Sequence, residues 1–168
     1  ATVWGANNTA NAQHSTAWGN SSDATGIGST AWGENAAATG GTATAWGNKT
    51  QATGNNGSTA FGNSTSAAND QATAWGSGTS ANGAFSTAWG TGSVAQGDGS
   101  TAWGNGAQAQ ADFATAWGSA QANANSSTAW GSATEASGPA SSAWGSSTDA
   151  SGSEATAWGS ETVASGLG

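Results

Sequence analysis

The stretch STAWGNSSDATGIG (residues 15–28) is followed directly by STAWGENAAATGGT (residues 29–42), so a tryptophan stands at the same place in two consecutive segments of fourteen residues. The pattern continues in twelve copies, and nine of the eleven spacings are 14 residues. A fixed period of this kind predicts one stacked repeat domain over residues 1–168. The aromatic positions are Trp4, Trp18, Trp32, Trp46, Phe61, Trp75, Trp89, Trp103, Trp117, Trp130, Trp144 and Trp158.

Two spacings depart from the period. The step from Trp46 to Phe61 is 15 residues, and the step from Trp117 to Trp130 is 13 residues. We expect the extra residue in the turn-like segment 55–57 and the missing one between residues 118 and 122, because turns tolerate changes in length better than strands do.

Alternation within one copy indicates strands. Ser15, Ala17 and Gly19 alternate with Thr16 and Trp18, and a similar alternation returns over residues 22–26. A coiled-coil heptad is excluded because large residues do not follow an a/d pattern, and Gly and Thr recur inside the segment. Period two predicts two strands of about five residues per copy, each followed by a two-residue turn. Twelve parallel coils stacked at about 4.8 Å would form a rod of roughly 50–60 Å.

Small side chains on one face of both strands are predicted to fill the inside of each coil. The Ser15 position is Ser or Ala in every copy, the Ala24 position is always Ala, and the Gly19 position is always Gly. One coil encloses little space, and small residues let its two strands approach closer than the usual sheet separation of about 10 Å. The predicted interior includes Ala17, Gly19, Ala24, Gly26, Ala31, Gly33 and Ala38.

The outward positions of the two strands differ. On the first strand they form a Thr column, which is Thr in eleven copies and Ser142 in the twelfth, and a Trp column, which contains the twelve aromatic residues. Together these two uncharged columns are called the Thr–Trp face. On the second strand the outward positions are mostly polar. Candidate contacts with another molecule on that strand are Asp23, Thr25, Gln51, Gln108, Glu135 and Asp149.

The Thr–Trp face is predicted to be covered by other copies of the chain. Twelve aromatic side chains of about 150–250 Å² each could present on the order of 2,000 Å², whereas monomers rarely expose an apolar patch above a few hundred Å². Burying each ring contributes roughly 1.5–3 kcal/mol, so twelve outweigh an association cost of about 4–15 kcal/mol. The predicted interface residues are Thr16, Trp18, Thr30, Trp32, Thr44, Trp46, Phe61, Trp75, Trp89, Trp103, Trp117, Trp130, Trp144 and Trp158.

Composition argues against several other classes of function. The net charge is −8, there is no Arg, and Lys49 is the one basic residue besides His14. Nucleic acids and anionic membrane surfaces would be repelled. With no Cys and a single His, we expect no catalytic residues, no metal site, no cofactor and no enzymatic activity. A Gly-Asp turn at Asp98 is similar to a calcium turn, but the calcium-binding repeat is not sustained.

The segment STAWGNSSDATG resembles the head repeat of the trimeric autotransporter adhesins of Gram-negative bacteria, the YadA-like head. That repeat has fourteen residues, with Ser-x-Ala-x-Gly followed by Ala-x-Ala or Ala-x-Gly. The resemblance extends from Thr2 to Gly166. It implies a single-stranded, left-handed parallel β-roll, three identical chains around one axis, exposure at the outer-membrane surface of the bacterium, and cell adhesion in virulence. In the family the residues matching Thr16 and Trp18 face the neighbouring subunits.

The chain departs from the family pattern in two respects. The family usually has an aliphatic residue at the Trp positions. We also recognise no signal peptide, neck, coiled-coil stalk or membrane barrel in these 168 residues, so we expect a piece of the head whose attachment to a membrane would depend on other regions.

The function favoured by these patterns is a non-enzymatic adhesin head that attaches to a host cell-surface or extracellular-matrix molecule. Two alternatives stay open, namely an ice-binding solenoid that uses the Thr column and a passive structural spacer. Phe85 and Phe113, which we assign to the second-turn position of Ile27, are expected either to contact a neighbouring chain or to be exposed contacts for a partner.

Overall fold

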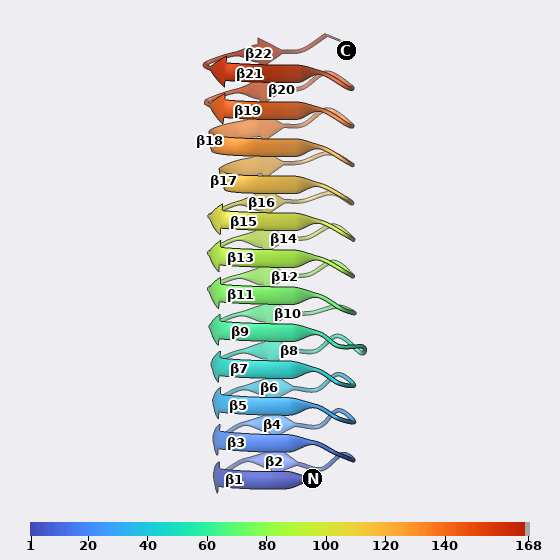
Figure 1. Cartoon of the computed structure of the whole chain (residues 1–168), viewed down its shortest axis with the longest axis vertical. Coiled ribbons are helices and arrows are strands. Elements are labelled where there is room, and N and C mark those ends of the chain that lie inside the picture. The colour runs from blue at the N-terminus through green and yellow to red at the C-terminus, as the bar shows by residue number, and fades with distance from the viewer. Residues whose placement is uncertain (167–168) are drawn as a thin grey trace.

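Each copy of the repeat forms one coil of a parallel β-solenoid in the computed structural model, which describes residues 1–166. The coils stack into a straight rod with the N- and C-termini at opposite ends (Figure 1). The strands nearer the viewer run from right to left as the chain climbs, and the return strands lie behind them, so the coil winds left-handed. The described residues contain no helix, and hence none long and apolar enough to span a membrane.

Most coils combine one five-residue strand with one two-residue strand. The longer strands, each containing one member of the Trp column, are β1 (Thr2–Ala6), β3 (Thr16–Asn20), β5 (Thr30–Glu34), β7 (Thr44–Asn48), β9 (Thr59–Asn63), β11 (Thr73–Ser77), β13 (Thr87–Thr91), β15 (Thr101–Asn105), β19 (Ser142–Ser146) and β21 (Thr156–Ser160). The shorter strands are β2 (Thr9–Ala10), β4 (Asp23–Ala24), β6 (Ala37–Ala38), β8 (Gln51–Ala52), β10 (Ser66–Ala67), β12 (Ser80–Ala81), β14 (Val94–Ala95), β16 (Gln108–Ala109), β20 (Asp149–Ala150) and β22 (Val163–Ala164). In β17 (Thr115–Ala122) and β18 (Thr128–Ala136) the two halves of the coil are one continuous strand.

Neighbouring coils pair parallel and in register. In β3 and β5, Thr16 lies opposite Thr30 and Trp18 lies opposite Trp32. The short strands pair in the same way, as β4 does with β6. Each repeat position therefore forms a column along the rod, and the long and short strands form two separate stacks on opposite sides of the interior.

The second strand is shorter than the five residues that its alternation predicts, because the second turn occupies more of the coil than two residues. The turn after β4 includes a Ser29 N–H that donates to the Gly26 carbonyl at 3.1 Å and a left-handed Gly28 with φ of 69°. The Gly28 N–H donates to the Gln13 carbonyl of the preceding coil at 2.8 Å. The residues after Ala24 therefore lead into this turn, and the second strand of the coil consists of Asp23 and Ala24 alone.

Both irregular spacings lie in the predicted segments, the extra residue in a turn and the missing one within the continuous strand β17. Asn56 bridges Gly41, whereas Ala52 continues the column of Ala38 through β8 and β6. The extra residue of that coil is therefore Asn55. In β17 and β18 the register shifts between Ser119 and Gln121, which places the missing residue there.

Small side chains form the core of each coil. Ala17, Ala24, Ala31 and Ala38 are completely buried, and Ser15 is 1% exposed. The largest completely enclosed side chains are threonines and serines, the threonines being Thr50, Thr65, Thr79, Thr134 and Thr148. The predicted interior of small residues is confirmed at these positions.

Two glycines predicted to face the interior have a different role. Gly19 and Gly33 are only half-buried, and their φ angles are 128° and 136°. A Cβ at Gly19 would collide with the Gly33 carbonyl of the next coil, and one at Gly33 would collide with the Gly47 carbonyl. These positions therefore need glycine because left-handed backbones of adjacent coils touch, while Gly26 is buried as predicted.

Candidate functional site

The Trp column is a continuous ladder of stacked aromatic rings on the long-strand stack. Trp18 and Trp32 have ring centroids 4.8 Å apart and planes inclined by 5°, and Trp32 and Trp46 are 4.6 Å apart at 2°. In-register parallel pairing places identical side chains at the strand spacing of about 4.7–4.9 Å, which suits offset stacking of indoles. The side chains point out of the coil, as the alternation predicts.

Stacking covers the ring faces and leaves the ring edges exposed. The tryptophans from Trp18 to Trp144 are 37–45% exposed in the single chain, while Trp4 is 66% and Trp158 is 74% exposed. The exposed aromatic area of one chain is therefore smaller than the sequence-based figure, which counted each ring separately. More than half of the surface of each tryptophan residue from Trp18 to Trp144 is already covered by the chain itself.

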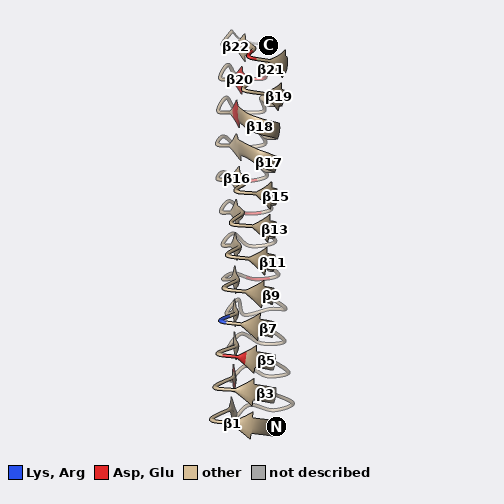
Figure 2. Ribbon diagram, turned by 90° about the vertical axis from the view of Figure 1, so that its left-hand side faces the viewer, with Lys and Arg blue, Asp and Glu red and all other residues tan. Residues whose placement is uncertain are grey.

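The Thr column lies beside the Trp column and is recessed. Thr16, Thr30 and Thr44 are half-buried, whereas the neighbouring indoles are exposed. No Asp, Glu, Lys, Arg or His occupies either column. The charged residues of the rod lie elsewhere, as Figure 2 shows for the acidic ends of β5 and β20 and for the basic turn after β7. The Thr–Trp face is thus an uncharged strip along the whole rod.

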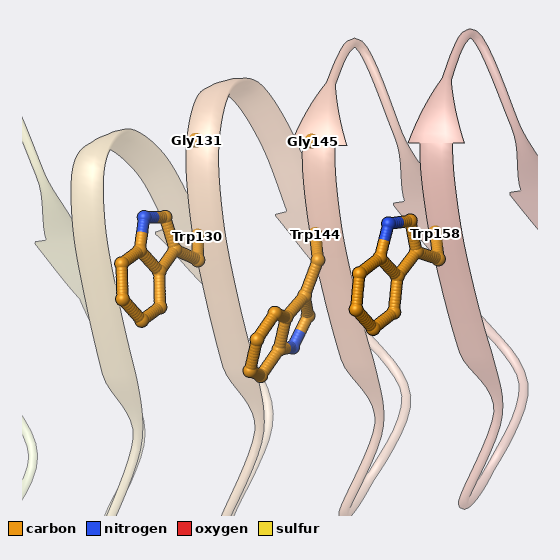
Figure 3. Close-up of a pocket in the computed structure, with 5 residues that line it drawn as sticks. All are labelled: Trp130, Gly131, Trp144, Gly145 and Trp158. Carbon is orange, nitrogen blue, oxygen red and sulfur yellow. The ribbon is translucent and has the colours of Figure 1, made fainter.

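Two positions interrupt the regular stacking. Phe61 is tilted by 44° from Trp46 and by 38° from Trp75. Trp144 is tilted by 32° from Trp130 and by 23° from Trp158. In Figure 3 its ring hangs lower than its neighbours, with the ring nitrogen on the opposite side.

The tilted Trp144 stands on the same strand as the one exception in the Thr column. Ser142, two residues earlier on the same face of β19, is the one member of the Thr column without a γ-methyl group. The absent methyl leaves room for the ring to swing toward that column. An open hollow results, lined by Trp130, Gly131, Trp144, Gly145 and Trp158.

The predicted partner residues lie on the outer side of the short-strand stack and its turns. Asp23, Thr25, Gln51 and Glu135 are exposed, and Gln108 and Asp149 are half-buried. Six residues that the sequence grouped together are therefore spread along the rod. Only one direct cross-strand neighbour relation joins two of them, that of Glu135 with Asp149.

That acidic pair has unequal surroundings. Glu135 Oε1 accepts a hydrogen bond from Asn123 Nδ2 at 3.0 Å, whereas the buried Asp149 Oδ1 has no hydrogen-bond partner. Like charges directly opposite on adjacent strands destabilise a sheet. The short-strand stack therefore tolerates unfavourable contacts that the Thr–Trp face does not contain.

Phe85 and Phe113 lie one position later than the sequence comparison assigned them. Both have left-handed φ angles, 57° and 58°, and belong to the position of Gly28, not to that of Ile27. They are 62% and 68% exposed. Residue types in this turn vary from copy to copy, so the sequence does not show which residues are equivalent. The positive φ angles do show it.

The acidic turn at Asp98 serves the contacts between coils. Asp98 Oδ1 accepts the Ala84 N–H at 2.8 Å, and the Asp98 N–H donates to Asp112 Oδ1 at 3.0 Å. In residues 1–166 no three His, Cys, Asp or Glu side chains gather closely enough to hold a metal ion. Comparison of the chain with known protein families and with curated proteins gives no match.

Proposed function

We propose that this chain is part of the head of a bacterial surface adhesin, assembled as a homotrimer through the Thr–Trp face and without enzymatic activity. The observation that carries the proposal is the continuous, uncharged Thr–Trp face, on which the inner indoles keep 37–45% of their surface exposed. An exposed strip of this length favours coverage by another protein surface.

The occupant that fits the whole face best is another copy of this chain. A partner that contacts every coil must repeat at the same axial spacing as the indole ladder, whose parallel rungs stand 4.6–5.1 Å apart. A parallel copy at the same height has this spacing automatically. The number of three copies, and the location at the outer-membrane surface, come from the resemblance to YadA-like heads.

In such an assembly the short-strand stack would face outward. It contains exposed polar and charged side chains, including Asp23, Gln51 and Glu135. We therefore assign the attachment to a host cell-surface or extracellular-matrix molecule to this stack and its turns. The Thr column would be covered together with the indoles and could not present a flat lattice to ice.

The assembly is tested by sedimentation equilibrium and by acrylamide quenching of the native chain. We expect three times the mass of one chain and indoles that are largely shielded from the quencher. A folded chain that sediments as a monomer, with readily quenched fluorescence, would contradict the proposed assembly.

Adhesion is tested by binding of the assembled protein to immobilised matrix proteins and cell-surface glycans. We expect saturable binding that weakens when Glu135→Lys and Asp149→Lys are introduced together, while Phe61→Leu serves as a control on the covered face. Absence of binding to every host surface, combined with thermal hysteresis in dilute solution, would favour the ice-binding alternative.

A further inference from the structure

The Thr–Trp face contains hydrogen-bonding groups that find no partner within the chain. No side-chain hydrogen bond of residues 1–166 involves an indole nitrogen or a hydroxyl group of the Thr column. The half-buried threonines of this column have no buried hydroxyl group that lacks a partner, so water reaches these hydroxyl groups in the single chain. The tryptophans are 37–74% exposed as residues, so the face as a whole is open to water. Covering the face would remove that water from both groups.

The indoles of Trp130 and Trp158 are not directed at the threonines of their own strands. In Figure 3 the ring nitrogen of Trp130 lies on the side of the ring toward Gly131, and that of Trp158 lies on the same side of its own ring, whereas the ring of Trp144 is turned the other way. The Thr column precedes the Trp column in each strand, so the N–H groups of Trp130 and Trp158 are directed away from it.

We propose that, in the assembly, the indole N–H groups of one copy donate hydrogen bonds to the Thr-column hydroxyl groups of the neighbouring copy, one bond for each coil that has a tryptophan. This rests on the proposed function, because it requires a second copy on the Thr–Trp face. In a closed ring of more than two copies, every contact joins two different strips of surface. The Thr column and the Trp column are the two strips that this face offers.

The polar groups of the face leave few alternatives to this arrangement. A donor that is buried without an acceptor is strongly unfavourable. The backbone of the long strands is already paired between coils through the ladder of the stack. The Thr hydroxyl is then the only side-chain acceptor in the two columns.

The single exception in the Thr column agrees with this role. Ser142 retains the hydroxyl group and lacks only the methyl group of threonine. Valine and isoleucine fit a strand at least as well as threonine does, yet neither occurs in this column in any of the twelve copies. In the Trp column, Phe61 is the one ring without an N–H donor, so its coil would lack this bond.

The test compares two matched double variants of the chain of residues 1–168. Thr87→Val with Thr101→Val removes two acceptors while preserving the shape of the side chains, and Thr87→Ser with Thr101→Ser preserves the acceptors while removing the methyl groups. Both sites flank well-stacked indoles, Trp89 and Trp103, which are 4.7 Å apart at 5°. Circular dichroism of each variant establishes that the coil is folded.

We expect the valine variant to dissociate at a concentration at least about a hundredfold higher than the parent, because several buried donors lose their acceptors at once. The serine variant is expected to stay within about tenfold of the parent. Ultraviolet resonance Raman spectra of the assembled parent should show the indole N–H band at a hydrogen-bonded frequency, and the valine variant should show a fraction at the free frequency.

The alternatives are distinguishable. A stable oligomer with free indole N–H groups, in which the valine variant assembles as tightly as the parent, would overturn this inference and leave the assembly itself intact. A chain that stays monomeric at all concentrations would overturn both the proposed assembly and the hydrogen bonds.

Discussion

The long-strand and short-strand stacks enclose the same narrow interior, yet they differ in how strictly the residue types at their outward positions repeat from coil to coil. On the long-strand stack the outward positions hold Thr and an aromatic residue in nearly every copy. On the short-strand stack one column runs from Asp23 through Ala37 to Gln51. The first stack is held by contacts between side chains of adjacent coils as well as by its backbone. The second depends mainly on backbone pairing, so its exposed side chains can vary.

The largest effect is expected from the glycine at the end of each long strand. Gly90→Ala would drive a Cβ into the Gly104 carbonyl at a φ of 116°, and we expect a loss of about 3 kcal/mol or more in unfolding free energy. Gly92→Ala is the matched control, because its φ of 62° is also left-handed but nothing lies within 4 Å of an added Cβ. Urea denaturation measures both, and an equal loss in the two variants would contradict the close-approach explanation.

Removing one rung of the indole ladder is expected to have the next largest effect. The Trp103 ring is stacked on both sides, 4.7 Å from Trp89 and 5.1 Å from Trp117. We expect Trp103→Ala to cost about 2–3 kcal/mol, measured by thermal unfolding. The corresponding change on the other stack, Gln108→Ala, should stay within about 0.5 kcal/mol. Similar losses at both sites would remove the distinction between the stacks.

Two buried hydroxyl groups of the interior should respond differently to removal, because Ser86 has a hydrogen-bond partner and Thr79 has none. Ser86 Oγ, on the long-strand side, donates to the Gly83 carbonyl at 2.6 Å, so Ser86→Ala should cost about 1 kcal/mol. The Thr79 hydroxyl, on the short-strand side, is buried without a partner. We expect Thr79→Val to be neutral or stabilising in the same denaturation experiment. A loss at Thr79 as large as that at Ser86 would indicate a hydrogen bond there.

Completing the ladder should stabilise the rod slightly. Phe61 is inclined by 44° and 38° to its neighbours, and Phe61→Trp would supply an indole like those above and below it. We expect a gain of about 0.5–1 kcal/mol, seen as a higher melting temperature. Phe61→Leu controls for loss of the ring and should lower it. A loss of stability with Trp would show that coil 46–61 has a narrower face than the others.

The smallest effect is expected on the short-strand stack, where Glu135 lies opposite Asp149. Glu135→Gln removes one of two like charges and keeps an oxygen that can accept from Asn123. We expect a gain of about 0.2–1 kcal/mol at low salt, which shrinks as the salt concentration rises. A gain that does not depend on salt would point to a cause other than charge.

Much of the fold follows from the sequence, because a repeat of nearly identical residues restricts how neighbouring coils can pair. The period sets the coil, and the alternation sets which residues point outward, as Ala17 and Trp18 show. What the pattern could not supply depends on backbone angles. The length of the second strand and the placement of Phe85 follow from left-handed turn residues of many types, from Gly28 to Phe113. The tilt of Trp144, on the strand that has Ser142 in place of Thr, is likewise a three-dimensional detail that the repeat pattern does not contain.

The position of the candidate site could be predicted from the sequence, but the contacts between its side chains could not. An uncharged Thr–Trp face follows from the columns alone, whereas the mutual coverage of the rings follows only from their spacing in three dimensions. The acidic residues assigned to partner binding share a side of the rod, but Asp23 and Glu135 lie many coils apart. Residue type and the alternation along each strand identify which residues share a surface. They do not show which of these residues are neighbours in space.

The extra residue Asn55 and the missing residue after Ser119 give the rod two landmarks on an otherwise uniform scaffold. Two copies that slid past each other by one coil would bring nearly the same side chains together, so the columns alone barely discriminate between alignments. Each of these two irregularities occurs in one coil only, and Phe61, the single Phe of the Trp column, distinguishes a third position along the rod. Parallel copies can match all three at once in a single alignment, which would let a nearly repetitive sequence assemble with its ends flush.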